Sequence, residues 1–150
     1  STKKKARSFS KTVMAFGLLV LISSCNTGPE PLKTGVDNCH FCKMTISDVR
    51  FGAEVVTKKG KVYKFDDSKC MINYLGTKDM EPKNLKNMYL TNYSGTHQLI
   101  DVNNALLLKA EDLRSPMGGN VAAFDNKDSL QTIQKRFNGK IITWSDLYKP

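Results

Sequence analysis

Two segments of the chain share one pattern, and this repeat constrains the fold more than any other feature. Each runs from a short β-rich stretch through Phe-Asp into a helical stretch, at residues 62–66 (VYKFD) and 121–125 (VAAFD). Neither half alone has enough residues to bury a sufficient core, so the repeat predicts two similar halves that fold together. Asp is also a common helix cap, so two matching strand-to-helix turns can arise without a duplication.

The hydrophobic pattern predicts the elements of each half. In the first half, residues 51–56 and 61–65 predict a hairpin, and Asp66-Asp67-Ser68 offers a cap for a helix that ends at Gly76. In the second half we expect strands at 88–93, 105–109, 121–124 and 141–144, a loop at 95–104, and a helix over 126–137 that Asp125 caps. The expected fold class is α+β, with two small strand-strand-helix-strand halves at residues 38–80 and 88–148 and a linker at 81–87.

The first 25 residues predict export. Basic residues at positions 3–5, 7 and 11 precede an apolar run at 13–22, which is shorter than the ~20 residues that span a bilayer. The sequence Leu21-Ile22-Ser23-Ser24-Cys25 resembles the lipobox of bacterial lipoproteins, which implies that Cys25 becomes the lipidated first residue. We therefore expect a signal peptide at 1–24, a flexible lipidated tether at 25–37, and a location on a bacterial membrane, facing the periplasm or the cell exterior.

Removal of this leader changes the charge of the chain. The full sequence has 23 basic and 14 acidic residues, and five of the basic residues lie in the leader, so residues 25–150 keep 18 and 14. The net charge falls from +9 to +4, which removes the main support for nucleic-acid binding. The lysine-rich stretch 58–61 is then expected to be solvated hairpin surface.

Three cysteines remain if Cys25 carries lipid: Cys39, Cys42 and Cys70. An odd number cannot form a closed set of disulfides, so at least one sulfur is left for redox exchange or metal binding. The densest group of soft ligands is Cys39-x-x-Cys42-x-Met44. Thioether sulfur suits copper(I) and is a poor ligand for zinc, so this pattern favours copper(I). Met117, in the turn-forming segment 115–119 (SPMGG), is either a further thioether ligand or a buried plug.

Other candidates leave alternatives open. His40 and Cys70 could complete a zinc site with the C-x-x-C pair, and His97 is a possible nitrogen donor, although an exposed loop position for each histidine and a core position for Cys70 are the simpler roles. The chain could be a zinc-stabilised structural lipoprotein, or a thiol oxidoreductase that uses Cys39 and Cys42. An oxidoreductase of the thioredoxin type needs a strand before the C-x-x-C, and the sequence supplies none. The nucleotide-binding, metalloprotease and Ser-His-Asp motifs are missing, so we expect no enzyme activity.

These motifs together resemble the NosL family. The resemblance is carried by residues 39–44, by Phe65-Asp66-Asp67 before Cys70-Met71, by residues 115–119 before Ala123-Phe124 and by the lipobox, and it runs from about residue 39 to 137. It implies two small α/β halves, similar also to a domain of the organomercurial lyases.

The resemblance also implies a function. Members of the family are lipoprotein copper(I) chaperones for the maturation of nitrous oxide reductase, an enzyme of denitrification. The implied partners are that reductase and a membrane-bound ABC-type assembly complex. The implied copper ligands are Cys39 or Cys42 together with Met117, and Met44 fits as a further sulfur donor.

Overall fold

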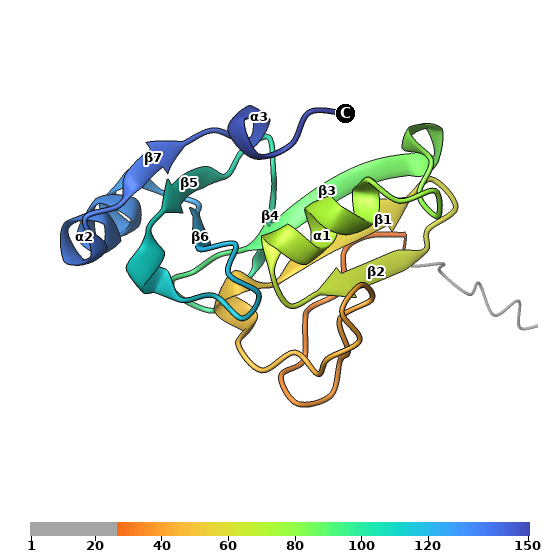
Figure 1. The fold of residues 1–150 in the computed structure, drawn as a ribbon, viewed down its shortest axis with the longest axis horizontal. Coiled ribbons are helices and arrows are strands. Elements are labelled where there is room, and N and C mark those ends of the chain that lie inside the picture. The colour runs from red at the N-terminus through yellow and green to blue at the C-terminus, as the bar shows by residue number, and fades with distance from the viewer. Residues whose placement is uncertain (1–26) are drawn as a thin grey trace, which may run out of the picture.

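The computed structural model describes residues 27–150, so the predicted signal peptide and Cys25 lie outside the described residues. The strands are β1 (Ala53–Thr57), β2 (Val62–Phe65), β3 (Leu85–Thr91), β4 (Leu99–Asp101), β5 (Leu106–Lys109), β6 (Val121–Phe124) and β7 (Lys140–Ile142). The helices are α1 (Ser68–Leu75), α2 (Lys127–Phe137) and α3 (Trp144–Leu147), with 3-10 turns η1 (Val49–Phe51), η2 (Pro82–Asn84) and η3 (Glu111–Leu113) (Figure 1). The predicted α+β class is confirmed. No helix within residues 27–150 is long and apolar enough to cross a membrane.

The two sheets repeat one strand order. In the first sheet β1 is flanked by β2 and β3, and β4 extends the sheet beyond β3; in the second sheet β5 is flanked by β6 and β7. All pairings are antiparallel. In each sheet the helix follows the second strand, and the next strand returns to pair with the first. The two units lie at opposite ends of the long axis in Figure 1.

The structure divides the chain at a different place from the one we expected. Strand β3 begins at Leu85 and pairs with β1 as far as Leu90, so it belongs to the first sheet. The expected linker at 81–87 and the start of the second half at residue 88 are therefore wrong. Strand β4 lies within residues 95–104, which we expected to be loop. The start of β3 carries Lys86 and Asn87, and such polar residues on a half-exposed strand resemble a loop when the sequence is considered alone.

Three element ends also differ from expectation. Phe51 lies in η1 and β1 starts at Ala53. Asn126 rather than Asp125 caps α2, because its side-chain oxygen accepts a hydrogen bond from Ser129 N at 2.9 Å. Trp144 starts α3 instead of ending a strand, since the residue before it forms a capping box with Asp146.

The helix of each half covers one face of its sheet. The repeated Phe-Asp frame places Phe65 and Phe124 at the ends of β2 and β6, and both side chains are fully buried. The first core cluster includes Ala53, Val55, Phe65, Met71 and Tyr74. The second includes Leu108, Phe124 and Leu130. Burial of one such side chain contributes about 1.5–3 kcal/mol, so these contacts fix each helix on its sheet.

Residues 27–37 pack against the first sheet instead of forming the flexible tether that we expected. Glu30 N donates a hydrogen bond to Glu54 Oε1 at 2.8 Å. Lys64 Nζ forms ion pairs with Glu30 at 3.4 Å and with Asp37 at 3.0 Å. Glu54 alternates with the core residues of β1 and so points to the opposite face, where it is 0% exposed. The segment therefore supplies the cover for the face that α1 leaves free.

The burial of Glu54 makes stability depend on pH. Burial raises the pKa of Glu54 from 4.5 to about 7, although the Glu30 N–H and Lys64 oppose the change. The folded protein binds this proton more tightly than the unfolded chain does. The stability that protonated Glu54 contributes is therefore fully present below about pH 4.5 and is lost as the pH rises towards 7. Relative to Glu54→Gln, the wild type should lose up to about 3 kcal/mol of unfolding free energy over this range. Urea unfolding of both proteins at several pH values measures the difference, and parallel pH profiles would contradict this assignment.

Candidate metal centre

Cys39 and Cys42 lie on a tight loop, residues 38–45, that closes on itself. The two ends of the loop form an isolated antiparallel bridge. Within it, Cys39 N donates to Met44 O at 2.8 Å and Lys43 N donates to Cys39 O at 2.9 Å. Lys43 has a φ of 66°, the left-handed conformation that turns the chain back after Cys42. The loop thus holds both cysteines three residues apart on one turn.

His40 attaches this loop to β2 and α1. Its backbone N donates to Lys64 O at 2.7 Å. Its ring lies 4.5 Å from the ring of Tyr63 and 4.9 Å from that of Tyr74, measured between centroids. Burial lowers the pKa of His40, and the nearby Lys43 lowers it further. The ring therefore packs as a neutral aromatic group that fixes the position of the cysteine loop.

The end of β2 and the first turn of α1 supply two further groups. Asp66 directly follows β2, and Cys70 lies in the first turn of α1. One potential ligand atom from each of Cys39, Cys42, Asp66 and Cys70 lies within 4.8 Å of the others. Cys42 Sγ is 3.6 Å from both carboxylate oxygens of Asp66. Three thiols and one carboxylate from three separate segments therefore meet at one point, which we call the thiol cluster.

The three thiols differ in exposure and in protonation. Cys39 and Cys70 are 0% and 1% exposed, whereas Cys42 is half-buried, and all three are free. Burial raises the pKa of Cys39. Burial also raises the pKa of Cys70, and the neighbouring Cys39 and Asp66 raise it further. Two buried neutral thiols thus lie next to a third cysteine that is only half-buried.

Asp67 anchors the predicted Met117 loop, residues 115–119, beside the thiol cluster. Its Oδ2 accepts hydrogen bonds from Ser115 Oγ at 2.5 Å, Met117 N at 3.0 Å and Gly119 N at 3.3 Å. The carboxylate is itself 1% exposed. At Gly119 a Cβ atom would overlap the Asp67 carboxylate, so the close approach requires glycine. Asp67 therefore fixes this loop of the second half next to Asp66, which belongs to the thiol cluster.

Met117 itself lies against the same core as the thiols. It is half-buried and packs on the first core cluster, which includes Cys39 and Cys70. Cys42 packs on that cluster as well. Sulfur-bearing side chains from both halves of the chain therefore contribute to one core, although residues 42 and 117 are far apart in sequence.

The other candidate residues are placed differently. Met44 is 61% exposed, on the surface of the cysteine loop. His97 lies between β3 and β4, with Nδ1 2.9 Å from Asn92 O. Among residues 27–150, neither His40 nor His97 joins the group of ligand atoms within 4.8 Å of one another. Cys70 does join it, although the sequence made a core position the simpler expectation.

Asp66 was missed by the sequence analysis as a possible ligand. The signal was present, because Asp66 and Cys70 flank the N-cap residue Asp67 and are four positions apart. A strand end followed by a helix start directs such a pair towards the same side of the turn. In the sequence, Asp66 belongs to the repeated Phe-Asp frame and to the helix cap, and neither role by itself points to metal binding.

The family model of NosL matches residues 32–149 of the sequence, a range that contains both sheets and the whole thiol cluster. The chain belongs to the NosL family. A solved structure, the copper chaperone NosL from Shewanella denitrificans, is similar with a TM-score of 0.64 and 18% sequence identity. The match covers 79% of this chain and 94% of that chain, and at this identity it shows that the fold is shared. No protein of curated function matches the sequence.

Proposed function

We propose that this NosL-family protein binds a copper(I) ion and delivers it for the assembly of a nitrous oxide reductase. The observation that carries the proposal is the thiol cluster, in which three cysteines converge within 4.8 Å. Soft thiolate ligands suit copper(I) as well as zinc, and the thioether of Met117 favours copper(I). The similar solved protein is named a copper chaperone, which agrees with this choice of cargo.

The proposed ligands come from both halves of the chain. Cys39 and Cys42 supply two sulfurs, and Cys70 adds a third from α1. We propose Met117 as the thioether ligand, because its loop is fixed to Asp67 beside the thiol cluster. Each thiol must lose its proton when the metal binds, and the Asp66 carboxylate next to Cys42 is placed to orient that thiol.

The exposure of the cysteine loop suits delivery. Cys42 is half-buried, and the exposed hydrophobic side chains of Phe41 and Met44 flank it, at 39% and 61%. A ligand from a partner can reach the ion on this side, while Cys39 and Cys70 hold it from behind. In this proposal Met44 contacts the ion during entry and transfer. The partners are the reductase and a membrane-bound ABC-type assembly complex.

Lipidation of Cys25 would keep the protein at a bacterial membrane, on the periplasmic or exterior side. The basic leader and apolar run before Cys25 support this part of the proposal. Mass spectrometry of the intact protein from membranes tests it, since a diacylglyceryl group on Cys25 and the loss of residues 1–24 give a defined mass. An unmodified N-terminus would refute lipidation without affecting the copper site.

Zinc is the second candidate cargo, and one observation favours it. Asp66 together with three thiols gives the four ligands that a structural zinc site requires. A thiol oxidoreductase has less support. The C-x-x-C pair lies on a loop before the first strand rather than at a helix N-terminus, and burial raises the pKa of Cys39, whereas reactive thiols have a lowered pKa.

Two experiments test the proposal. In anaerobic dialysis against both metals, the protein should retain copper(I) in the presence of excess zinc, and displacement of copper by zinc would overturn the choice of cargo. In a nitrous-oxide-reducing bacterium that lacks this gene, the reductase should contain little copper, and the wild-type gene but not Cys42→Ser should restore it. A fully copper-loaded reductase in the deletion strain would reject delivery while leaving copper binding intact.

A further inference from the structure

One end of the molecule is strongly basic. The turn between β1 and β2 lies beside the segment that leads into β3, because Lys58 N donates to Asn84 O at 2.9 Å. We call residues 57–61 and 78–86 the basic end, and both stretches lie at the same end of the long axis in Figure 1. Six lysines lie on it, all exposed: Lys58, Lys59, Lys61, Lys78, Lys83 and Lys86.

The basic end carries the whole net charge of residues 25–150. Its only acidic residues are Asp79 and Glu81, and Glu81 is paired with Lys83 at 2.6 Å. Six lysines and two acids give a net charge of +4. The remainder of residues 25–150 has 12 basic and 12 acidic residues, so it is neutral. Such an asymmetry produces a local positive potential that attracts an anionic surface.

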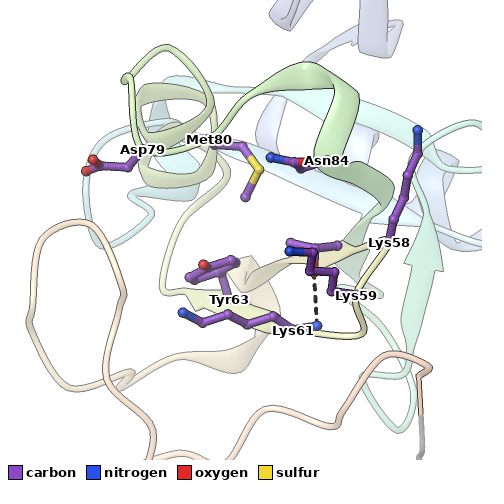
Figure 2. Close-up of a pocket in the computed structure, with 8 residues that line it drawn as sticks. Lys58, Lys59, Lys61, Tyr63, Asp79, Met80 and Asn84 are labelled. Atoms are coloured by element: carbon purple, nitrogen blue, oxygen red, sulfur yellow. Dashed lines mark hydrogen bonds between the residues drawn. The ribbon is translucent and has the colours of Figure 1, made fainter.

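A pocket opens in the basic end, as Figure 2 shows. Its lining combines apolar groups of Tyr63 and Met80 with the lysines of the turn, Lys58, Lys59 and Lys61. Lys61 Nζ lies 4.9 Å from the centroid of the Tyr63 ring. Asp79 also lines the pocket, so three lysines outweigh one carboxylate, and this basic and partly apolar lining suits the phosphate and the upper glycerol part of a phospholipid.

The chain enters the described structure at this same end. Thr27 packs against the β1–β2 turn, since a Cβ atom on Gly60 would lie 3.2 Å from Thr27 Cγ2. Two residues of chain span at most about 7 Å. Cys25, the proposed lipidation site, is therefore tied by the covalent chain to the neighbourhood of the basic end.

We propose that the basic end docks on the anionic phospholipid surface of the membrane and so fixes the orientation of the protein. The proposal rests on lipidation of Cys25, which brings the turn to the bilayer. The thiol cluster lies at the other end of β2, where Asp66 is five residues from Lys61, about 16 Å along a strand. Docking at the basic end leaves the cysteine loop, which His40 attaches to Lys64 further along β2, open to a partner protein.

The test is lysine acylation of the full chain as isolated from bacterial membranes. The protein is reconstituted into phosphatidylcholine vesicles with or without phosphatidylglycerol, and modification of each lysine is followed by mass spectrometry. Acylation of Lys58, Lys59 and Lys61 should slow by about fivefold or more with phosphatidylglycerol. The protection should disappear at about 1 M salt, where the screening length is about 3 Å. The exposed residues Lys127, Lys135 and Lys140, at the opposite end in Figure 1, should react equally in all samples.

Matched variants sharpen the test. The triple change Lys58→Gln, Lys59→Gln and Lys61→Gln should abolish the protection of Lys83 and Lys86, and the same three substitutions at positions 127, 135 and 140 should leave it intact. Equal acylation with and without phosphatidylglycerol, or protection of Lys127 instead, overturns the proposal. A wash at high salt separates this failure from a failure of lipidation, because an anchored chain stays on the vesicles whether or not its lysines are protected.

Discussion

Cys70→Ser should weaken copper(I) binding by more than about 100-fold, since loss of a neighbour of the ligands alone costs about 10–100-fold. Cys70 is 1% exposed and belongs to the thiol cluster, so its sulfur faces the proposed ion and not the solvent. Serine keeps the shape and can donate a hydrogen bond to Asp66, so the fold should be retained. Competition with a chromogenic copper(I) chelator measures the affinity, and circular dichroism checks the fold.

The control for this change is the residue that follows Cys70. Met71 is fully buried in the same helix, where its side chain leaves the helix axis about 100° round from that of Cys70. Met71→Leu conserves volume and should cost less than about 1.5 kcal/mol of stability, with unchanged copper affinity. An equal loss of affinity in the two variants would show that the helix packing matters and that Cys70 is not a ligand.

Asp67→Ala should destabilise the protein by about 3–5 kcal/mol. The carboxylate accepts the cap hydrogen bond from Lys69 N at 2.8 Å and three more from the 115–119 loop. Alanine removes the cap, at about 0.5–2 kcal/mol, and leaves the buried Ser115 hydroxyl without its acceptor, at about 1–3 kcal/mol, while the two part-buried backbone donors add a smaller cost. Because Met117 lies in this loop, copper(I) affinity should fall by about 10–100-fold as well.

Urea unfolding and chelator competition measure the two effects of Asp67→Ala. Asp125→Ala is the control, because Asp125 occupies the matching position after Phe124 but is exposed and does not cap α2. It should change the unfolding free energy by less than about 0.5 kcal/mol. An Asp67 variant with unchanged stability would contradict the role of this carboxylate as the link between the halves.

The local elements could be predicted from the sequence because their signals are local. The repeated Phe-Asp frame marked the ends of β2 and β6, and the helices that follow begin within two or three residues of it. The error at β3 has a different origin. This strand pairs with β1, about 30 residues earlier, and nothing in its own polar start reveals that partner.

The candidate site, too, could be predicted from the sequence only where its signals are local. The C-x-x-C-x-Met pattern pointed to Cys39 and Cys42, which the structure brings together. Convergence with Asp66 and Cys70 depends on how the loop 38–45 docks on β2 through His40, a long-range contact that spacing cannot reveal. The exposure of Met44 follows from the left-handed turn at Lys43, which the C-x-x-C-x-Met spacing does not reveal.

The central claim is that sulfur from both halves of the chain binds one copper ion. X-ray absorption at the selenium edge tests it on copper(I)-loaded protein that contains selenomethionine in place of methionine. We predict a copper–selenium distance in the wild type that disappears in Met117→Leu and persists in Met44→Leu. A wild-type spectrum without copper next to selenium, or one that Met117→Leu leaves unchanged, would contradict the account.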